Sequence, residues 1–86
     1  MAITYILFSK LKNRFYVGSS RANDLVVRLK AHNSGKVRST KFGQPWVEIA
    51  KEIFDGYTDA RKREIFLKSG VGRNWLKSQF GYLKQS

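Results

Sequence analysis

Glu64 is the acidic residue in this sequence that is least easily explained as an ordinary surface residue. Ala60, Glu64 and Leu67 follow one another at i, i+4 and i+7 of a predicted helix, so the carboxylate lies on or beside the stripe that faces the core. An acid in that position needs a partner. It either forms an ion pair with an Arg or with Lys68 at i+4, or binds a hard cation such as Mg²⁺ together with water and phosphate oxygens. The sequence leaves both interpretations open.

The other five acidic residues have ordinary explanations. Asp24 and Asp59 stand at predicted helix starts, and Asp55 stands in a turn. Glu48 and Glu52 have the opposite parity to the apolar residues of a predicted strand, so we expect both in solvent. Glu64 is therefore the acid most open to a chemical role.

Two tyrosines form a second group of candidate residues. Ile3–Phe8 and Arg14–Val17 are apolar or β-branched runs separated by a polar stretch, which is typical of an antiparallel hairpin. With an even number of residues in the hairpin loop, Tyr5 and Tyr16 project from the same face as near neighbours. The pair is either amphipathic core or two hydroxyls that converge on one site.

Arg28 and His32 form a third group, because their i, i+4 spacing places them on one side of a predicted helix. An arginine offers a permanent bidentate charge that suits a phosphoryl oxygen, and a histidine can move protons near neutral pH. The alternatives are a solvated base and a helix-end histidine favoured by the helix dipole.

The elements that would position these residues begin with the hairpin. A helix over about residues 24–33 follows, capped by Asn23 or Asp24 and ended near Gly35. Residues 34–45 predict a basic loop, and Trp46–Phe54 predicts a third strand. In that strand the apolar side chains that share one parity are Val47, Ile49 and Ile53.

The C-terminal half predicts two helices. Thr58 is expected to cap the first, which runs to about Lys68 and stops at Ser69 and Gly70. The second starts at about Gly72 and is expected to pack inward through Trp75, Leu76 and Phe80. The order β-β-α-β-α-α predicts an α+β fold, a small three-stranded antiparallel sheet flanked by helices, in one domain spanning residues 1–86.

Composition narrows the functional classes. Seventeen Lys and Arg against six Asp and Glu give a net charge of +11 on 86 residues, which favours a nucleic-acid partner over a generic basic surface or an anionic membrane. The chain has no Cys and one His, which excludes disulfides, thiol catalysis, cysteine zinc sites and most all-histidine metal sites. No membrane-spanning run or signal peptide is visible, so we expect a cytoplasmic protein.

Taken together, the candidate residues and their order resemble the GIY-YIG nuclease superfamily, most closely its small, single-domain bacterial and phage members. The runs that carry the resemblance are Ile3–Leu7, Phe15–Ser20, Arg28–Lys36 and Arg61–Glu64. They occur in the family's order, and the likeness extends from Ile3 to about Leu76. The first motif departs from the family pattern, because Ile3 and Thr4 stand in place of Gly and Ile.

The resemblance implies a divalent-cation-dependent phosphodiesterase that uses Mg²⁺ or Mn²⁺. The matching positions are Tyr5 and Tyr16 for the motif tyrosines, Gly18 for the motif glycine, Arg28, His32, Glu64 as the metal ligand, and Asn74 as a loose match to a downstream asparagine. Tyr5, aided by Tyr16 or His32, would orient or deprotonate an attacking water, and Arg28 would neutralise charge on the phosphoryl oxygens. Cleavage would leave a 5′-phosphate and a 3′-hydroxyl.

Further basic residues are candidates for contacts to the nucleic-acid backbone. These are Arg21, Lys36, Arg38 and Lys41, and they are expected to position the substrate without reading its sequence. Phe42 either packs or stacks on an exposed base.

The expected function is a DNA endonuclease selective for structure or for single strands, because no second domain is present to recognise a long site. Its partner would be single-stranded, branched or duplex DNA. The alternatives are a non-catalytic nucleic-acid-binding module on the same fold, and a nuclease subunit that requires an unknown protein partner.

Overall fold

The apolar run near the N-terminus forms the middle strand of the sheet. In the computed structural model, which describes residues 1–21 and 25–84, β1 (Ala2–Ser9) pairs antiparallel with β2 (Arg14–Ser20) and with β3 (Trp46–Phe54). Every residue of β1 is buried. A strand covered on both faces needs apolar side chains at successive positions, which explains why this segment does not alternate.

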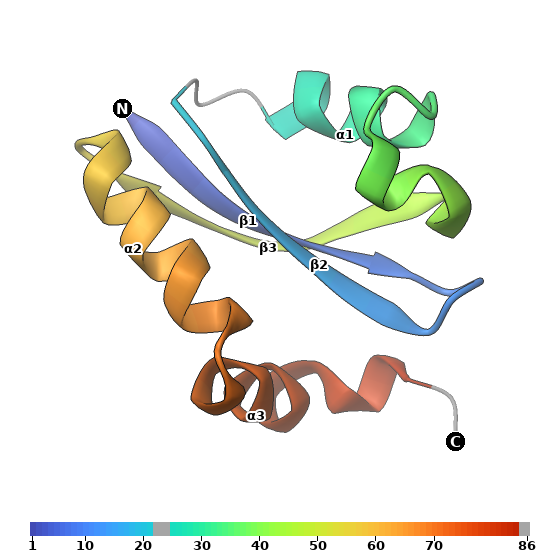
Figure 1. The fold of residues 1–86 in the computed structure, drawn as a ribbon. Coiled ribbons are helices and arrows are strands. Elements are labelled where there is room, and N and C mark those ends of the chain that lie inside the picture. Colours follow the sequence, from blue (N-terminus) through green and yellow to red (C-terminus); the bar gives the residue numbers. More distant parts are fainter. Residues whose placement is uncertain (22–24, 85–86) are drawn as a thin grey trace.

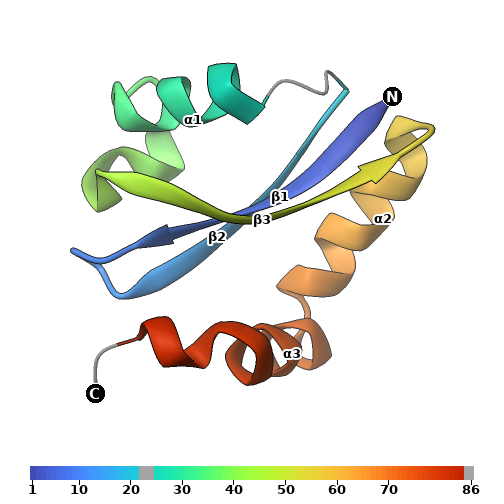
Figure 2. The ribbon, with the colours of Figure 1, turned by 180° about the vertical axis from the view of Figure 1, so that it is seen from behind.

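Different helices cover the two faces of the sheet (Figure 1). On one face lie α1 (Leu25–Asn33) and the short 3₁₀ helix η1 (Arg38–Gly43), and on the other lie α2 (Tyr57–Lys68) and α3 (Gly70–Phe80), followed by η2 (Gly81–Leu83). Figure 2 shows the same two layers of helices from behind. This arrangement confirms the predicted α+β fold and its order of elements.

Alternation along β1 divides the core into two clusters. The cluster on the α1 side contains Ile3, Tyr5, Leu7 and Trp46. The cluster on the side of α2 and α3 contains Ile6, Val17, Leu67 and Leu76, with Trp75 and Phe80 packed against it as predicted. Tyr5 therefore faces α1, whereas the hydroxyl of its neighbour Thr4 donates to the Ala60 carbonyl of α2 at 2.7 Å.

The predicted faces of β3 are wrong because the strand contains a bulge. The pairing with β1 shifts between Ile6, which lies opposite Ala50, and Leu7, which lies opposite Glu48. One extra residue on β3 reverses the parity beyond it. Val47 therefore pairs with Phe8, and Ile53 pairs with Ile3, so the two side chains do not share one face of the sheet as predicted. The side chains of Val47 and Ile53 are both exposed.

The two acids of β3 differ in their surroundings. Glu48 is exposed as expected. Glu52 is half-buried and accepts a hydrogen bond from Arg63 Nε of α2 at 2.8 Å. The prediction that both are solvated is therefore confirmed for Glu48, whereas the Glu52 side chain is 41% exposed and also forms an ion pair that was not predicted.

Several predicted element boundaries also need correction. Thr58 does not cap α2, because the helix begins at Tyr57 after an extended Gly56 and has no side-chain cap. Ser69 accepts a hydrogen bond from the Gly72 backbone N–H at 3.2 Å, and this cap starts α3 at Gly70, earlier than predicted. The segment predicted as a basic loop contains η1. The predicted caps Asn23 and Asp24 lie outside the described residues.

Candidate active site

The two tyrosines lie on the same face of the hairpin, as predicted. Tyr5 pairs with Gly18 and Leu7 pairs with Tyr16, so the tyrosines are diagonal neighbours with ring centroids 6.5 Å apart. Gly18 makes this arrangement possible. A Cβ at Gly18 would overlap the Tyr5 hydroxyl and ring, with Cε2 only 2.9 Å away. The ring of the middle strand can therefore lie across the edge strand β2 only because this position has no side chain.

The Tyr5 hydroxyl is part of a buried chain of hydrogen bonds that ends in η1. His32 Nε2 lies 3.2 Å from the Tyr5 hydroxyl, and its Nδ1 lies 2.8 Å from the Thr40 hydroxyl. The Thr40 hydroxyl donates to the Val37 carbonyl at 3.2 Å. Because that hydroxyl has one proton, it accepts from His32 Nδ1–H, and Nε2 then accepts from the Tyr5 hydroxyl.

Burial determines the protonation of this chain. His32 is fully buried, and this burial, together with the nearby charge of Arg28, lowers the pKa of the imidazole. Burial also raises the pKa of the Tyr5 phenol, although the hydrogen bond and charge of Arg28 act in the opposite direction. At neutral pH the pair is therefore a neutral phenol bonded to a neutral imidazole.

Arg28 brings a positive charge to the other side of the Tyr5 hydroxyl. Its guanidinium donates a hydrogen bond to Tyr5, which raises the pKa of the Arg28 guanidinium further. Its Nε is buried and has no acceptor among the described residues. An incoming anion that reached this nitrogen would satisfy a buried donor, and leaving such a donor unpaired costs about 1–3 kcal/mol.

Glu64 is buried in α2 on the opposite face of the sheet, with 5% of its surface exposed. Its carboxylate accepts hydrogen bonds from Ser19 of β2, from Lys68 at 2.6 Å and from Arg61 at 2.8 Å. Burial alone would raise the pKa of this carboxyl, but the bonds from Lys68, Ser19 and Arg61 together hold the pKa below its usual value. The ion pair predicted with Lys68 is confirmed, and Glu64 is ionised at neutral pH.

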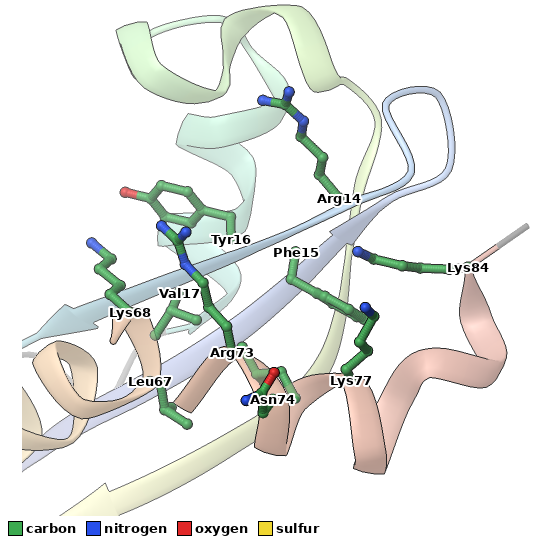
Figure 3. A pocket seen from close by; sticks show the side chains of 11 residues that line it. Arg14, Phe15, Tyr16, Val17, Leu67, Lys68, Arg73, Asn74, Lys77 and Lys84 are labelled. Atoms are coloured by element: carbon green, nitrogen blue, oxygen red, sulfur yellow. The ribbon is translucent and has the colours of Figure 1, made fainter. Parts of the chain in front are cut away.

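Tyr5, Tyr16 and His32 form a tyrosine cluster on one face of the sheet, and Glu64 lies on the other. The two groups approach each other at the edge of β2. Lys68 joins them, because its Nζ bonds Glu64 and also lies 5.6 Å from the centroid of the Tyr16 ring (Figure 3). Tyr16 is half-buried, and its ring lies 4.8 Å from that of His32. Tyr5 and His32 are both buried, so Tyr16 is the member of this cluster that faces the outside.

The oxygen donors at Glu64 fit a hard divalent cation. Ser19 and Glu64 supply a hydroxyl and an ionised carboxylate. The side chains of Arg61 and Lys68 that share the carboxylate are 51% and 46% exposed, so both have room to move aside. Within residues 1–21 and 25–84, no group of three or more His, Cys, Asp or Glu gathers. A cation here would depend on water and on substrate oxygens for its remaining ligands, as Mg²⁺ commonly does.

The predicted backbone-contact residues lie in two separate parts of the fold. Arg21 is exposed at the end of β2 with its guanidinium 4.9 Å above the Tyr57 ring. The exposed residues Lys36, Arg38 and Lys41 lie between α1 and β3. Phe42 is 72% exposed, which rules out the predicted packing role and keeps base stacking as a prediction. Asn74 is exposed on α3 and, together with Tyr16 and Lys68, lines a hollow between β2 and α3 (Figure 3).

The family-model comparison agrees with this geometry. The model of the GIY-YIG catalytic domain matches residues 1–77 of the 86-residue chain. The chain belongs to the GIY-YIG family. Searches of curated proteins and of solved structures find no match to it. A GIY-YIG catalytic domain is a nuclease domain, so the buried acid and the tyrosine cluster lie in a domain whose substrates are nucleic acids.

No helix in the described ranges is long and apolar enough to cross a membrane.

Sequence reasoning missed two residues that orient side chains of the candidate active site. Thr40 fixes the imidazole of His32, and Ser19 of β2 donates to Glu64 of α2. Ser19 had a usable signal, because the strand position after Gly18 has the parity opposite to Tyr16 and so faces α2. Thr40 had none, since nothing local in residues 34–45 indicates η1.

Proposed function

We propose that this protein is a divalent-cation-dependent endonuclease that hydrolyses phosphodiester bonds in DNA. Cleavage leaves a 5′-phosphate and a 3′-hydroxyl, and single-stranded or branched DNA is preferred to a continuous duplex. The observation that carries this proposal is the ionised, buried carboxylate of Glu64. It is separated from Tyr16 only by the edge of β2, where Lys68 contacts both residues. Binding to phosphates alone would have no use for a carboxylate there.

Glu64, with the Ser19 hydroxyl beside it, would hold the cation. A bound Mg²⁺ or Mn²⁺ would supply positive charge that stabilises the negative charge developing during phosphodiester hydrolysis. Arg61 and Lys68 turn from the carboxylate toward phosphate when the substrate binds. Arg28 donates to the phosphoryl oxygens, where its fixed charge offsets the charge that develops during attack.

The tyrosine and histidine residues orient the attacking water. Tyr16 is the partly exposed member of the cluster and meets the water and the substrate. Tyr5 lies behind it, with its proton directed at His32 Nε2 and its oxygen facing Arg28. The raised pKa of Tyr5 means that a phenolate is not its resting state, so Tyr5 can take up a proton only after passing its own proton to His32.

The test is cleavage of end-labelled single-stranded, branched and duplex DNA with Mg²⁺ or Mn²⁺. Wild type is compared with Glu64→Gln, Tyr5→Phe and Tyr16→Phe. Matched controls change the same residue types elsewhere, namely Glu48→Gln on the exposed face of β3 and Tyr82→Phe, whose side chain is 80% exposed.

We expect wild type and both controls to cut, with the three site variants slowed at least about 100-fold while still binding DNA. End-group analysis of the products identifies the 5′-phosphate. If no substrate is cut with either cation while wild type binds DNA normally, the catalytic proposal fails. The chain is then a binding module, or a subunit that needs a partner.

A further inference from the structure

A hollow of about 640 Å³ opens between β2 and α3 beside the candidate active site (Figure 3). Tyr16 and Lys68 belong both to the wall of this hollow and to the active-site cluster. None of the four basic residues expected from the sequence to contact the nucleic-acid backbone lines it. Its size lies within the range of ordinary ligand sites, roughly 300–1,000 Å³.

The rim of the hollow is basic. Its cations are Arg14, Lys68, Arg73, Lys77 and Lys84, all of them exposed, and no acidic residue is among the residues that line it. Figure 3 shows Arg73 extending from α3 toward β2, and Lys77 and Lys84 beside Phe15. Lys68 is bonded to Glu64, whereas the other four make no ion pair with a carboxylate in the described part of the chain. The rim therefore attracts an anion that carries several charges.

The floor of the hollow is apolar. It consists of Phe15, Val17, Leu67 and Leu76, which connect it to the core between the sheet and the helices. The Phe15 ring is half-buried, and the Lys84 ammonium lies 5.3 Å from its centroid. A ligand that matches this hollow has a flat apolar part for the floor and negative charges for the rim.

We propose that this hollow binds an unpaired nucleotide of the substrate strand, with its base against Phe15 and its phosphates against Arg73, Lys77 and Lys84. A base within a duplex is stacked and paired on both sides and cannot reach such a floor without leaving the helix. The inference rests on the proposed nuclease function, and it names the part of the substrate that selects for single-stranded character. It also assigns to α3 a binding role in addition to its packing role.

The location is tested by an amide chemical-shift titration of the nitrogen-15-labelled full chain, in EDTA so that no cleavage occurs. The probe is an oligothymidylate of about eight nucleotides, a typical length for a single-strand site. We expect saturable shifts in residues 14–17 and 73–84, and weaker shifts with a blunt duplex of the same length. Shifts confined to residues 36–43, or equal shifts with the duplex or with an oligoglutamate of the same charge, overturn the proposal.

The charges are tested by the variant Arg73→Ala/Lys77→Ala/Lys84→Ala. The matched control, Lys30→Ala/Lys51→Ala/Lys62→Ala, removes the same charge from exposed positions outside the hollow. Each lost single-strand phosphate contact lowers the slope of log K against log salt by about 0.7, so we expect the rim variant to lose about 2 in slope. An unchanged slope in the rim variant, or an equal loss in the control, contradicts the proposal.

The base is tested from the ligand side, so that no folding defect can interfere. An abasic oligomer with the same number of phosphates should bind wild type about tenfold more weakly than oligothymidylate, because stacking contributes roughly 1–3 kcal/mol per base. Equal affinities for the two oligomers would mean that the hollow binds phosphates only. That result overturns the proposal that a base lies against Phe15. All three measurements are made without a divalent cation, so loss of hydrolysis with intact binding here counts against the nuclease proposal alone.

Discussion

At the scale of single residues, the Tyr5 hydroxyl has one defined orientation because the hydrogen bonds from Tyr5 through His32 to Thr40 can be arranged in only one way. Thr40 uses its proton on the Val37 carbonyl, so the imidazole proton sits on Nδ1 and Nε2 accepts from Tyr5. Arg28 then donates to the remaining face of the hydroxyl. The burial that fixes this chain also makes it sensitive to acid, because protonated His32 would lose its place as an acceptor.

We therefore predict that the free energy of unfolding falls as the pH falls below about 6.5, the usual pKa of histidine. Because the pKa of folded His32 is lowered, the unfolded chain binds a proton more readily between the two pKa values. The contribution of His32 to the free energy of unfolding is fully present above pH 6.5. As the pH falls further, it decreases by up to about 1.4 kcal/mol per pH unit until the pKa of folded His32 is reached. Urea unfolding at a series of pH values measures the slope.

The control for this prediction is His32→Gln, which removes the one histidine in the chain. Its overall stability is expected to be lower, but its slope between pH 7 and the lowered pKa should be nearly flat. The same slope in wild type and variant would show that another group titrates in this range.

Gly18 carries a second prediction at this scale. The substitution Gly18→Ala places a methyl group on the Tyr5 ring, so one of the two must move, and overpacking of this kind typically costs about 1–3 kcal/mol. Urea denaturation should show that loss, and cleavage should fall because Tyr5 leaves its place against His32. The control is Gly81→Ala, where the new Cβ meets only Lys77 Cγ at 3.9 Å and stability should stay within about 0.5 kcal/mol. Equal midpoints for Gly18→Ala and wild type would contradict the close approach.

The sequence predicted where the candidate residues lie in the fold better than it predicted their surroundings. Periodicity alone placed Glu64 on the buried stripe of its helix and Tyr5 beside Tyr16, because both facts depend on local spacing. Thr40 could not be found this way, since its contact with His32 depends on how residues 34–45 fold back over α1. Residues that orient others through tertiary contacts leave no local pattern.

At the scale of elements, the misplaced features have two different causes. The bulge in β3 appears only in its pairing with β1, which the spacing of apolar residues does not reveal. The start of α3 is set locally, by the cap that Ser69 provides for the Gly72 backbone N–H. Asn33 makes a tertiary contact of the first kind, because its side chain bonds both the backbone N–H and the carbonyl of Trp46 and so fixes the end of α1 to the start of β3. The strands and helices themselves were predictable, since their apolar patterns were long enough to indicate the type of element.

The junction of α2 and α3 carries a prediction at this scale. Gly72 is buried, and a Cβ there would overlap the Phe66 carbonyl and lie 2.5 Å from Leu67 Cα. Because backbone cannot rotate away as a side chain can, Gly72→Ala should cost about 1–3 kcal/mol and displace α3. Thermal unfolding, which reports the loss, should show a lower midpoint.

The matched control is Gly70→Ala, two residues earlier in the same helix, where nothing lies within 4 Å of the new methyl. It should leave stability unchanged or raise it by up to about 1 kcal/mol, since alanine is the better helix former. If Gly72→Ala also retains or gains stability, the two helices do not meet as closely as the structure indicates.

At the scale of the whole molecule, the charges are unevenly compensated. Ion pairs in the described part of the chain join Arg61, Lys68 and Arg63 to just two acids, Glu64 and Glu52. Most of the 17 bases therefore face solvent without a carboxylate beside them. The cations of α3 adjoin the candidate active site, whereas those at residues 36–41 lie on the α1 side of the sheet.

This separation predicts different roles for the two sets of cations. The variant Lys36→Ala/Arg38→Ala/Lys41→Ala should weaken binding by a similar factor for single-stranded and duplex DNA of any sequence, because contacts to phosphate carry no sequence information. Its salt slope on single strands should fall by about 2, and cleavage at saturating substrate should match wild type. Fluorescence anisotropy across a salt series, followed by single-turnover cleavage, measures both quantities. A loss confined to one sequence, or to the cleavage rate, would show that residues 36–41 take part in recognition or chemistry and do not act through charge alone.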